Sequence, residues 1–272
     1  MYVTQKTNAD LLERPFVQMG ARVKFEELRP NRWTRVVGPV ELNVRTDKNG
    51  EYFLVRKRAD ASLEVLDVQP GDRHLLLLSR APEGRRETKA RFLLGHDERH
   101  WFVAAIPERT PVSTVIAAKE ALKPEEVVRE EHGVRLKTRQ RRVNKARIRQ
   151  GEWFFVPRND FKANARLILK NEPLMRGRGK PHMCQELYRE GGETVYVNRQ
   201  YPNGLTGPQF ARLSEKARSQ PGWRTMVRNP RVLVRGTVRH SDHKTIFLNG
   251  WHEVFVNTET RAAAMRNVAF LD

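Results

Sequence analysis

The sequence predicts a mainly β protein: a β-rich α+β chain of two small barrel-like or sandwich-like domains joined by a short helical element. Short alternating or apolar segments recur in both halves of the chain, and turn signals such as Asn-Gly separate them. Helical periodicity is confined to two places. The chain has 272 residues, of which 39% are hydrophobic, so it is long enough to build two packed cores.

Residues 1–109 are predicted to form a near-neutral β-rich domain. Asn49-Gly50 separates two alternating segments, and this dipeptide is the strongest local signal for a hairpin. A Pro70-Gly71 turn and a polar tip at 96–99 separate further pairs of apolar segments. The expected strand pairs are 40–45 with 52–56, 63–68 with 74–78, and 91–95 with 101–106.

Residues 110–134 are predicted to form a helical connector. Thr110-Pro111 suits the start of a helix, because a hydroxyl can cap it and proline fits its first turn. Glu125 and Glu126 follow a proline and suit the positive end of a second helix. Gly133 is a suitable stop for that second helix.

Residues 135–272 are predicted to form an Arg-rich basic β domain with one helix near 207–219. The helix is expected because Thr206-Gly-Pro precedes an apolar spacing of three and four residues, which Pro221-Gly222 ends. A strand is expected over 232–238. Asn249-Gly250 predicts a second hairpin between apolar segments.

The positive charge of the chain lies almost entirely in this second half. Residues 135–272 hold 28 basic and 11 acidic residues, a net charge of +17, whereas residues 1–134 hold 23 and 21. Such asymmetry indicates a polyanionic partner for one half. Arginine can grip a phosphate with two hydrogen bonds and stack on bases, and aromatic residues such as Trp153 and Trp223 are interleaved with the arginines. We therefore expect nucleic-acid binding, with RNA or single-stranded DNA favoured over a duplex.

The expected phosphate contacts come from three basic stretches. In 135–150 the basic residues alternate, so an extended segment would present one cationic face, and an Arg-rich helix is the alternative. The spacing of four between the last three arginines would place them on one face of a strand. The predicted nucleic-acid-binding residues are Arg135, Lys137, Arg139, Arg141, Lys145, Arg147, Arg149, Arg176, Arg178, Lys180, Arg231, Arg235 and Arg239.

Histidines in the second half raise the alternative of a nuclease or related phosphodiester enzyme. Two residues separate His240 from His243 in a predicted turn, where both imidazoles could reach one divalent metal ion. His182 is the third candidate ligand, and Glu186 completes the candidate catalytic set. Such an ion could activate water against a phosphodiester. Without a metal, the same histidines could act as general acid and base.

A third alternative is a basic structural or interaction subunit of a macromolecular assembly, and the first half could dock a protein partner. The phosphate loop, the dinucleotide fingerprint and the Gly-x-Ser-x-Gly elbow are all absent from the sequence. The single cysteine, Cys184, cannot form an intramolecular disulfide and suits a small buried apolar residue. No apolar run has membrane-spanning length, and the first residues lack a secretory signal. We expect a reducing, cytoplasmic location and no membrane partner.

Overall fold

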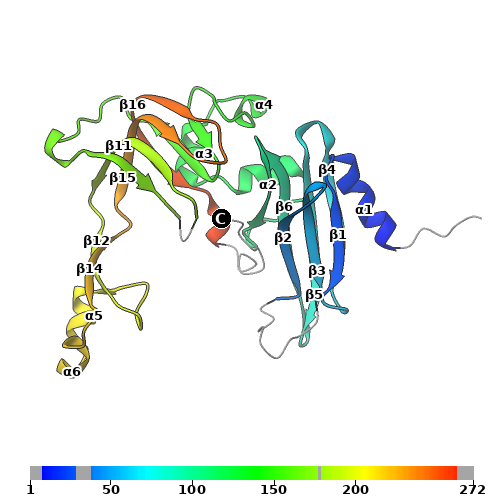
Figure 1. Ribbon diagram of the computed structural model, residues 1–272, viewed down its shortest axis with the longest axis horizontal. Helices are drawn as coiled ribbons and strands as arrows, with labels where there is room; N and C mark the ends of the chain where they lie inside the picture. Colours follow the sequence, from blue (N-terminus) through cyan, green and yellow to red (C-terminus); the bar gives the residue numbers. More distant parts are fainter. Residues whose placement is uncertain (1–7, 29–37, 177–178, 262–272) are drawn as a thin grey trace, which may run out of the picture.

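A computed structural model of the chain describes residues 8–28, 38–176 and 179–261 (Figure 1). It is mainly β, as predicted, with short helices and several separate sheets. The described strands do not close a barrel. The division into two domains at residues 109 and 135 stays a prediction.

The first half contains two sheets. One has the strand order β1-β3-β2 and the other the order β4-β5-β6-β7. Neighbouring strands are antiparallel except for β1 and β3, which are parallel and were not predicted to pair. All three predicted hairpins are confirmed, and Gly50 has the positive φ of +98° that its turn requires. The strands are β1 (Val23–Glu27), β2 (Val40–Asp47), β3 (Gly50–Lys57), β4 (Ser62–Gln69), β5 (His74–Glu83), β6 (Arg86–Asp97) and β7 (His100–Ile106), and a 3-10 turn, η1 (Pro70–Asp72), joins β4 to β5.

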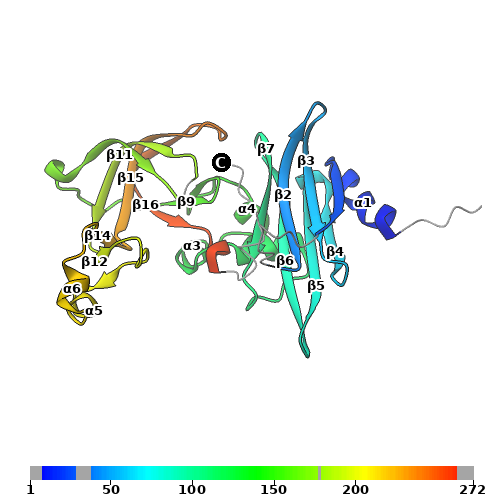
Figure 2. The ribbon, with the colours of Figure 1, turned by 60° about the horizontal axis from the view of Figure 1, so that its bottom comes forward.

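The two sheets of the first half share one core, and the four-stranded sheet is covered on its other face as well (Figure 2). Leu75 and Leu77 face the three-stranded sheet together with Phe16 of α1 (Asn8–Gln18). Leu76 faces the opposite way and packs with Val115 of α2 (Val115–Ala121). Burial of both faces explains why this strand has a continuous apolar run in place of an alternating pattern.

The predicted helical connector is present as α2 and α3 (Glu125–Glu130). The N-cap of α2 is Thr114, whose Oγ1 accepts a hydrogen bond from the Ala117 amide at 3.2 Å, so the expected start at Thr110 is four residues too early. A residue of β4 also fixes the start of this helix, because the Val115 amide donates to Asp67 Oδ2 at 2.7 Å. Gly133 follows α3 with a φ of +74°.

The second half contains a six-stranded sheet and a smaller three-stranded one. Their strand orders are β10-β11-β15-β16-β9-β8 and β13-β12-β14. The smaller sheet and its two helices extend away from the larger sheet as an arm (Figure 1). The elements are β8 (Ile148–Gln150), β9 (Trp153–Pro157), η2 (Ala165–Leu167), β10 (Leu169–Leu174), β11 (His182–Glu190), β12 (Glu193–Val197), β13 (Leu205–Thr206), α5 (Gly207–Ala211), α6 (Glu215–Arg218), β14 (Arg224–Arg228), β15 (Arg231–Arg239), β16 (Ile246–Val256) and η3 (Thr258–Arg261).

The predicted extended segment over 135–150 is wrong for most of its length. Residues Leu136–Arg139 form a helical turn, α4, a loop follows, and only Ile148–Gln150 is a strand. Alternating basic and polar residues offer no apolar face to bury, so nothing fixes them in a sheet. The predicted cationic face is therefore not formed: Arg147 is buried, whereas Arg141 and Lys145 are exposed.

Two further predictions in the second half are corrected. The segment around Asn249-Gly250 is no hairpin turn, because residues on both sides of it pair with the same strand, β15. The register shifts there from Val234↔His252 to Gly236↔Leu248, and Gly250 has a φ of +80° inside one continuous β16. The single helix expected near 207–219 is two short helices, since Ser214 caps a new one. The strand expected at 232–238 is confirmed as part of β15.

Candidate metal centre and cationic surface

Three histidines from two distant parts of the sequence meet at one end of the six-stranded sheet. His182 begins β11, and His240 and His243 lie in the turn that follows β15. One ring nitrogen from each lies within 4.8 Å of the others. The ring centroids of His182 and His240 are 4.1 Å apart, and those of His240 and His243 are 4.6 Å apart. The three candidate metal ligands predicted from the sequence therefore form one cluster.

His182 is held in one tautomer by a neighbouring amide. Its ring is buried, and its Nδ1 lies 2.9 Å from Gln150 Oε1. The amide nitrogen of Gln150 donates to the carbonyl of Lys244 at 2.7 Å, so its oxygen must face the histidine. His182 therefore carries its proton on Nδ1 and keeps a free lone pair on Nε2. Such an outer hydrogen bond is what orients metal-binding histidines in proteins.

His243 lies between the backbone of the second half and two carboxylates of the first. Its Nδ1 is 3.9 Å from both Asp97 Oδ2 and Glu98 Oε2, which belong to the β6–β7 turn. This nitrogen is buried and has no hydrogen-bond partner among the described residues. On its other side, a Cβ at Gly151 would stand 2.7 Å from Nε2 of the ring. A side chain at position 151 would therefore collide with this ring.

His240 is hydrogen-bonded to the backbone of its own turn. Its Nδ1 accepts a hydrogen bond from the Asp242 amide at 3.1 Å, so the neutral ring carries its proton on Nε2. A metal ion bound through Nδ1 would displace this hydrogen bond, and one bound through Nε2 would displace the proton of that nitrogen. The backbone amide of Asp242 thus orients the His240 ring.

The charge state of the cluster suits metal binding. Burial, and then the neighbouring charges of His240 and His243, lower the pKa of His182 to about 3. Burial and the charge of His240 lower the pKa of His243 to about 4. Both rings are therefore neutral at neutral pH, and the neutral imidazole is the form that binds a metal ion.

Glu152 is the carboxylate nearest to His182. Its Oε2 lies 3.9 Å from His182 Nε2, and burial raises its pKa. No pattern in the sequence identified Glu152, Gln150, Asp97 or Glu98 as neighbours of the histidines. Their proximity depends on the pairing of β8 with β9 and of β9 with β16, and on the contact between the β6–β7 turn and the turn after β15. No local pattern encodes these contacts.

No protein-family model, curated protein or solved structure matches this chain.

In the part of the chain that the structure describes, no helix combines the length and the apolar character that crossing a membrane requires.

Two other candidates from the sequence lie outside the cluster. Glu186 accepts from Arg235, with Oε2 2.5 Å from Nη2, and it is not part of the histidine group. Cys184 is only 1% exposed, and burial raises the pKa of its thiol to about 12. It packs with Leu187 and Val238 as a small apolar residue.

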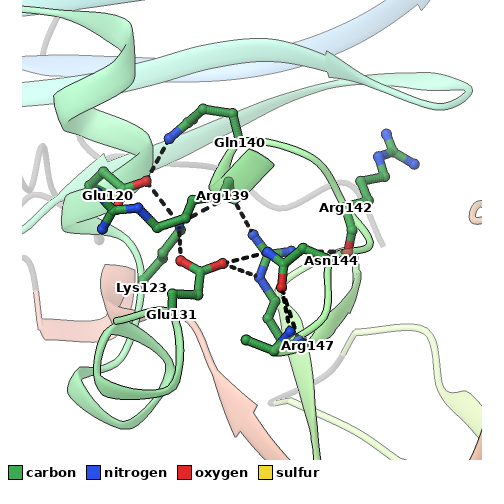
Figure 3. A network of polar contacts seen from close by, with 9 residues as sticks. Glu120, Lys123, Glu131, Arg139, Gln140, Arg142, Asn144 and Arg147 are labelled. Carbon is green, nitrogen blue, oxygen red and sulfur yellow. Dashed lines mark hydrogen bonds and ion pairs between the residues drawn. The ribbon is translucent and has the colours of Figure 1, made fainter. Parts of the chain in front are cut away.

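The predicted phosphate-binding cations divide into paired and unpaired groups. Most of those on β15 and in the network of Figure 3 contact carboxylates of the protein itself. The paired cations are Arg139 with Glu120, Arg147 with Glu131, Arg176 with Glu259, Lys180 with Asp242, Arg231 with Glu190 and Glu253, and Arg235 with Glu186. Arg178 lies outside the described residues.

The unpaired group is exposed and clusters around α4. Within the described residues, no carboxylate lies within 4.0 Å of these side chains. They are Arg135, Lys137, Arg141 and Lys145, with Arg239 at the end of β15. Arg149 also has no described carboxylate within 4.0 Å, but it is half-buried. Arg142, beside Arg141, contacts Asp97 and Glu98, the two carboxylates that face His243. The unpaired cations near residue 141 therefore border the histidine cluster.

Proposed function

We propose that the protein holds a divalent transition-metal ion on His182, His240 and His243 and uses it to cleave phosphodiester bonds in nucleic acid. The observation that supports this best is the convergence of three imidazole donors, one of them fixed in its tautomer by Gln150. Three protein ligands and an open position are typical of catalytic zinc sites. The buried Nδ1 of His243, which lacks a hydrogen-bond partner among the described residues, also fits an unfinished coordination shell.

The proposal gives the residues around the histidine cluster separate roles. The ion would supply Lewis acidity and an activated water. Gln150 keeps the lone pair of His182 Nε2 available, and Asp97 and Glu98 face His243. Glu152, whose pKa burial raises, is placed to accept or return a proton beside the cluster. Arg141 and Lys145 would hold the phosphates that lead into the site.

Metal binding is tested by zinc titration of EDTA-treated protein. We expect one equivalent to bind to the wild type, and H182N and H243N to bind at least ~10-fold more weakly, because each loses a ligand. H132N is the matched control, since His132 is exposed and lies outside the cluster. Equal zinc binding by H243N and H132N, or no zinc binding by the wild type, would contradict the proposal.

Cleavage is tested on labelled single-stranded RNA and DNA with zinc, manganese or EDTA. We expect metal-dependent product that H240A and H243A abolish while their circular dichroism stays that of the wild type. Full cleavage by both variants would show that the histidines are not the site.

Nucleic-acid binding without cleavage is the second candidate, and the exposed cations around α4 favour it. Log affinity for single strands falls with log salt by about 0.7 for each phosphate contacted. We expect replacement of Arg135, Lys137, Arg141 and Lys145 by Gln to flatten this slope by about 2 to 3. The same replacement of Arg45, Lys48, Arg85 and Arg86, exposed cations of the first half, should leave it unchanged.

Two results of such binding experiments would contradict these candidate functions. Equal slopes for the two fourfold variants would place the contacts elsewhere. Binding to polyglutamate but not to nucleic acid would favour the basic interaction subunit over both candidates. The proposal also includes a cytoplasmic location and a protein partner for the first half. It includes no membrane partner.

A further inference from the structure

A small cavity lies where the helical connector meets the second half. Its volume is about 30 Å³, room for one or two waters or a compact ion. Five cationic side chains and no carboxylate line it, together with the amides Gln140 and Asn257. The cations are Lys119, Lys123, Arg139, Arg147 and Arg149, and Figure 3 shows three of them.

The carboxylates behind the cavity are already engaged. Glu131 is fully buried and contacts Lys123 Nζ at 2.5 Å and Arg147 Nε at 2.9 Å (Figure 3). Glu120 Oε1 accepts from Lys123 at 2.8 Å and from Gln140 at 2.5 Å, and its Oε2 lies 3.5 Å from Arg139. Two carboxylates therefore serve three cations before Lys119 and Arg149 are counted.

Of the five cations around the cavity, Arg149 has the least negative charge from the protein close to it. Its Nε donates to the Gly151 carbonyl at 2.8 Å, and no described carboxylate lies within 4.0 Å of it. Burial lowers its pKa, against the more distant charges of Glu152, Glu259 and Glu98. Burial lowers the pKa of Lys119 and Arg147 too, and the charge of Arg149 adds to both effects. The like charges around the cavity thus repel one another.

An unsatisfied hydrogen-bond donor also indicates that the cavity binds an anion. Arg139 Nε is buried without a hydrogen-bond partner among the described residues. A buried cation or donor without a partner costs free energy, so such a group calls for a bound acceptor. Guanidinium groups match the oxygens of a tetrahedral anion with paired hydrogen bonds. The cavity is too small for a base or a sugar, which leaves a compact oxyanion as the fitting ligand.

We propose that this cavity binds a phosphate group, either inorganic phosphate or a terminal phosphate monoester, with Arg149 as its central contact. This goes beyond the proposed function, because the cavity shares no residue with the histidine cluster. The two sources present the same tetrahedral oxyanion to the same cations.

The test is calorimetric titration of EDTA-treated protein with inorganic phosphate, against sodium chloride of equal ionic strength. EDTA removes any metal that could bind phosphate at the histidines. We expect saturable phosphate binding that R149M weakens at least tenfold, because methionine keeps the bulk of the side chain without its charge. K48M should bind phosphate as the wild type does, since Lys48 is exposed and does not line the cavity.

A second arm separates the two sources. Arg149-dependent preference for a 5′-phosphorylated tetranucleotide over its 5′-hydroxyl form would identify a terminal phosphate, and equal binding of both would identify the free ion. If R149M fails to fold, K119M serves in its place, with a smaller loss expected because Lys119 also pairs with Asp72. Phosphate binding no stronger than that of chloride, or unchanged in the folded variants, would overturn the proposal.

Discussion

Gly151 places the backbone directly against the ring of His243. It has a φ of +57°, and an added Cβ would stand 2.7 Å from Nε2 of that ring. We expect G151A to lower the free energy of unfolding by about 1–2 kcal/mol, because alanine is strained at this φ. The displaced ring should also weaken zinc binding at least ~10-fold. Urea unfolding and zinc titration measure the two effects.

G133A is the matched control for this prediction. Gly133 has a φ of +74°, but a Cβ there would meet nothing within 4 Å. It should cost similar free energy and leave zinc binding unchanged. Wild-type zinc affinity in G151A would show that the ring position does not depend on the glycine.

The buried histidines predict a loss of stability in acid. Their pKa values are lowered to about 3 for His182 and about 4 for His243. Between these values and about 6.5 the unfolded chain binds protons that the folded protein does not, so the free energy of unfolding falls as pH falls through this window. Each histidine contributes at most about 1.4 kcal/mol per pH unit, and nothing above pH 7.

Urea unfolding of metal-free protein at pH 7, 6 and 5 measures this slope. H182Q should flatten it, because the variant has one fewer group to titrate. H132Q replaces an exposed histidine and should keep the wild-type slope. Identical slopes in H182Q and the wild type would place the acid sensitivity in other groups.

Among the elements, α3 is fixed to the segment 139–147 through one buried carboxylate. Glu131, which caps α3, contacts Lys123 and Arg147 and accepts from Asn144 at 2.8 Å (Figure 3). We expect E131Q to cost about 3–5 kcal/mol in urea unfolding, because it leaves two buried cations without their shared partner.

E130Q is the control, since Glu130 is the preceding residue and its pair with Arg158 leaves its side chain 42% exposed. An exposed pair contributes about 1 kcal/mol or less. Similar losses in E130Q and E131Q would mean that the buried network does not hold α3 in place.

At the scale of the whole molecule, the histidine cluster of the second half contacts the β6–β7 turn of the first half. Arg142 contacts Asp97 and Glu98, the Lys244 amide donates to Glu98, and Arg99 Nη1 donates to the Ser241 carbonyl at 3.2 Å. A metal ion that orders the turn after β15 should therefore also order the β6–β7 turn.

Hydrogen exchange with and without zinc tests this coupling. We expect slower exchange in three segments, 96–101, 150–153 and 239–244, which are far apart in sequence. Peptides from the arm, 193–228, should exchange at the same rate in both states, because the arm follows the end of β11 opposite to His182. Protection confined to 239–244 would show that the halves respond separately.

The sequence by itself determined the mainly β class, the three hairpins of the first half and the proximity of His240 and His243. These depend on local chemistry: Asn49-Gly50 favours one turn, alternation shows which face is buried, and His240 and His243 are close in any turn that joins them. The sequence could not place His182 beside them, because that contact needs the pairing of β11 with β15.

Only the tertiary structure decided which cations are buried and whether Asn249-Gly250 forms a turn or a bulge. Arg147 and Arg141 stand in the same alternating pattern, yet Glu131 holds one inside and the other is exposed. Asn249-Gly250 has the composition of a turn, yet both flanks pair with β15 and make it a bulge. A local pattern records what a residue can do, whereas the partner that selects among these options comes from a distant part of the chain.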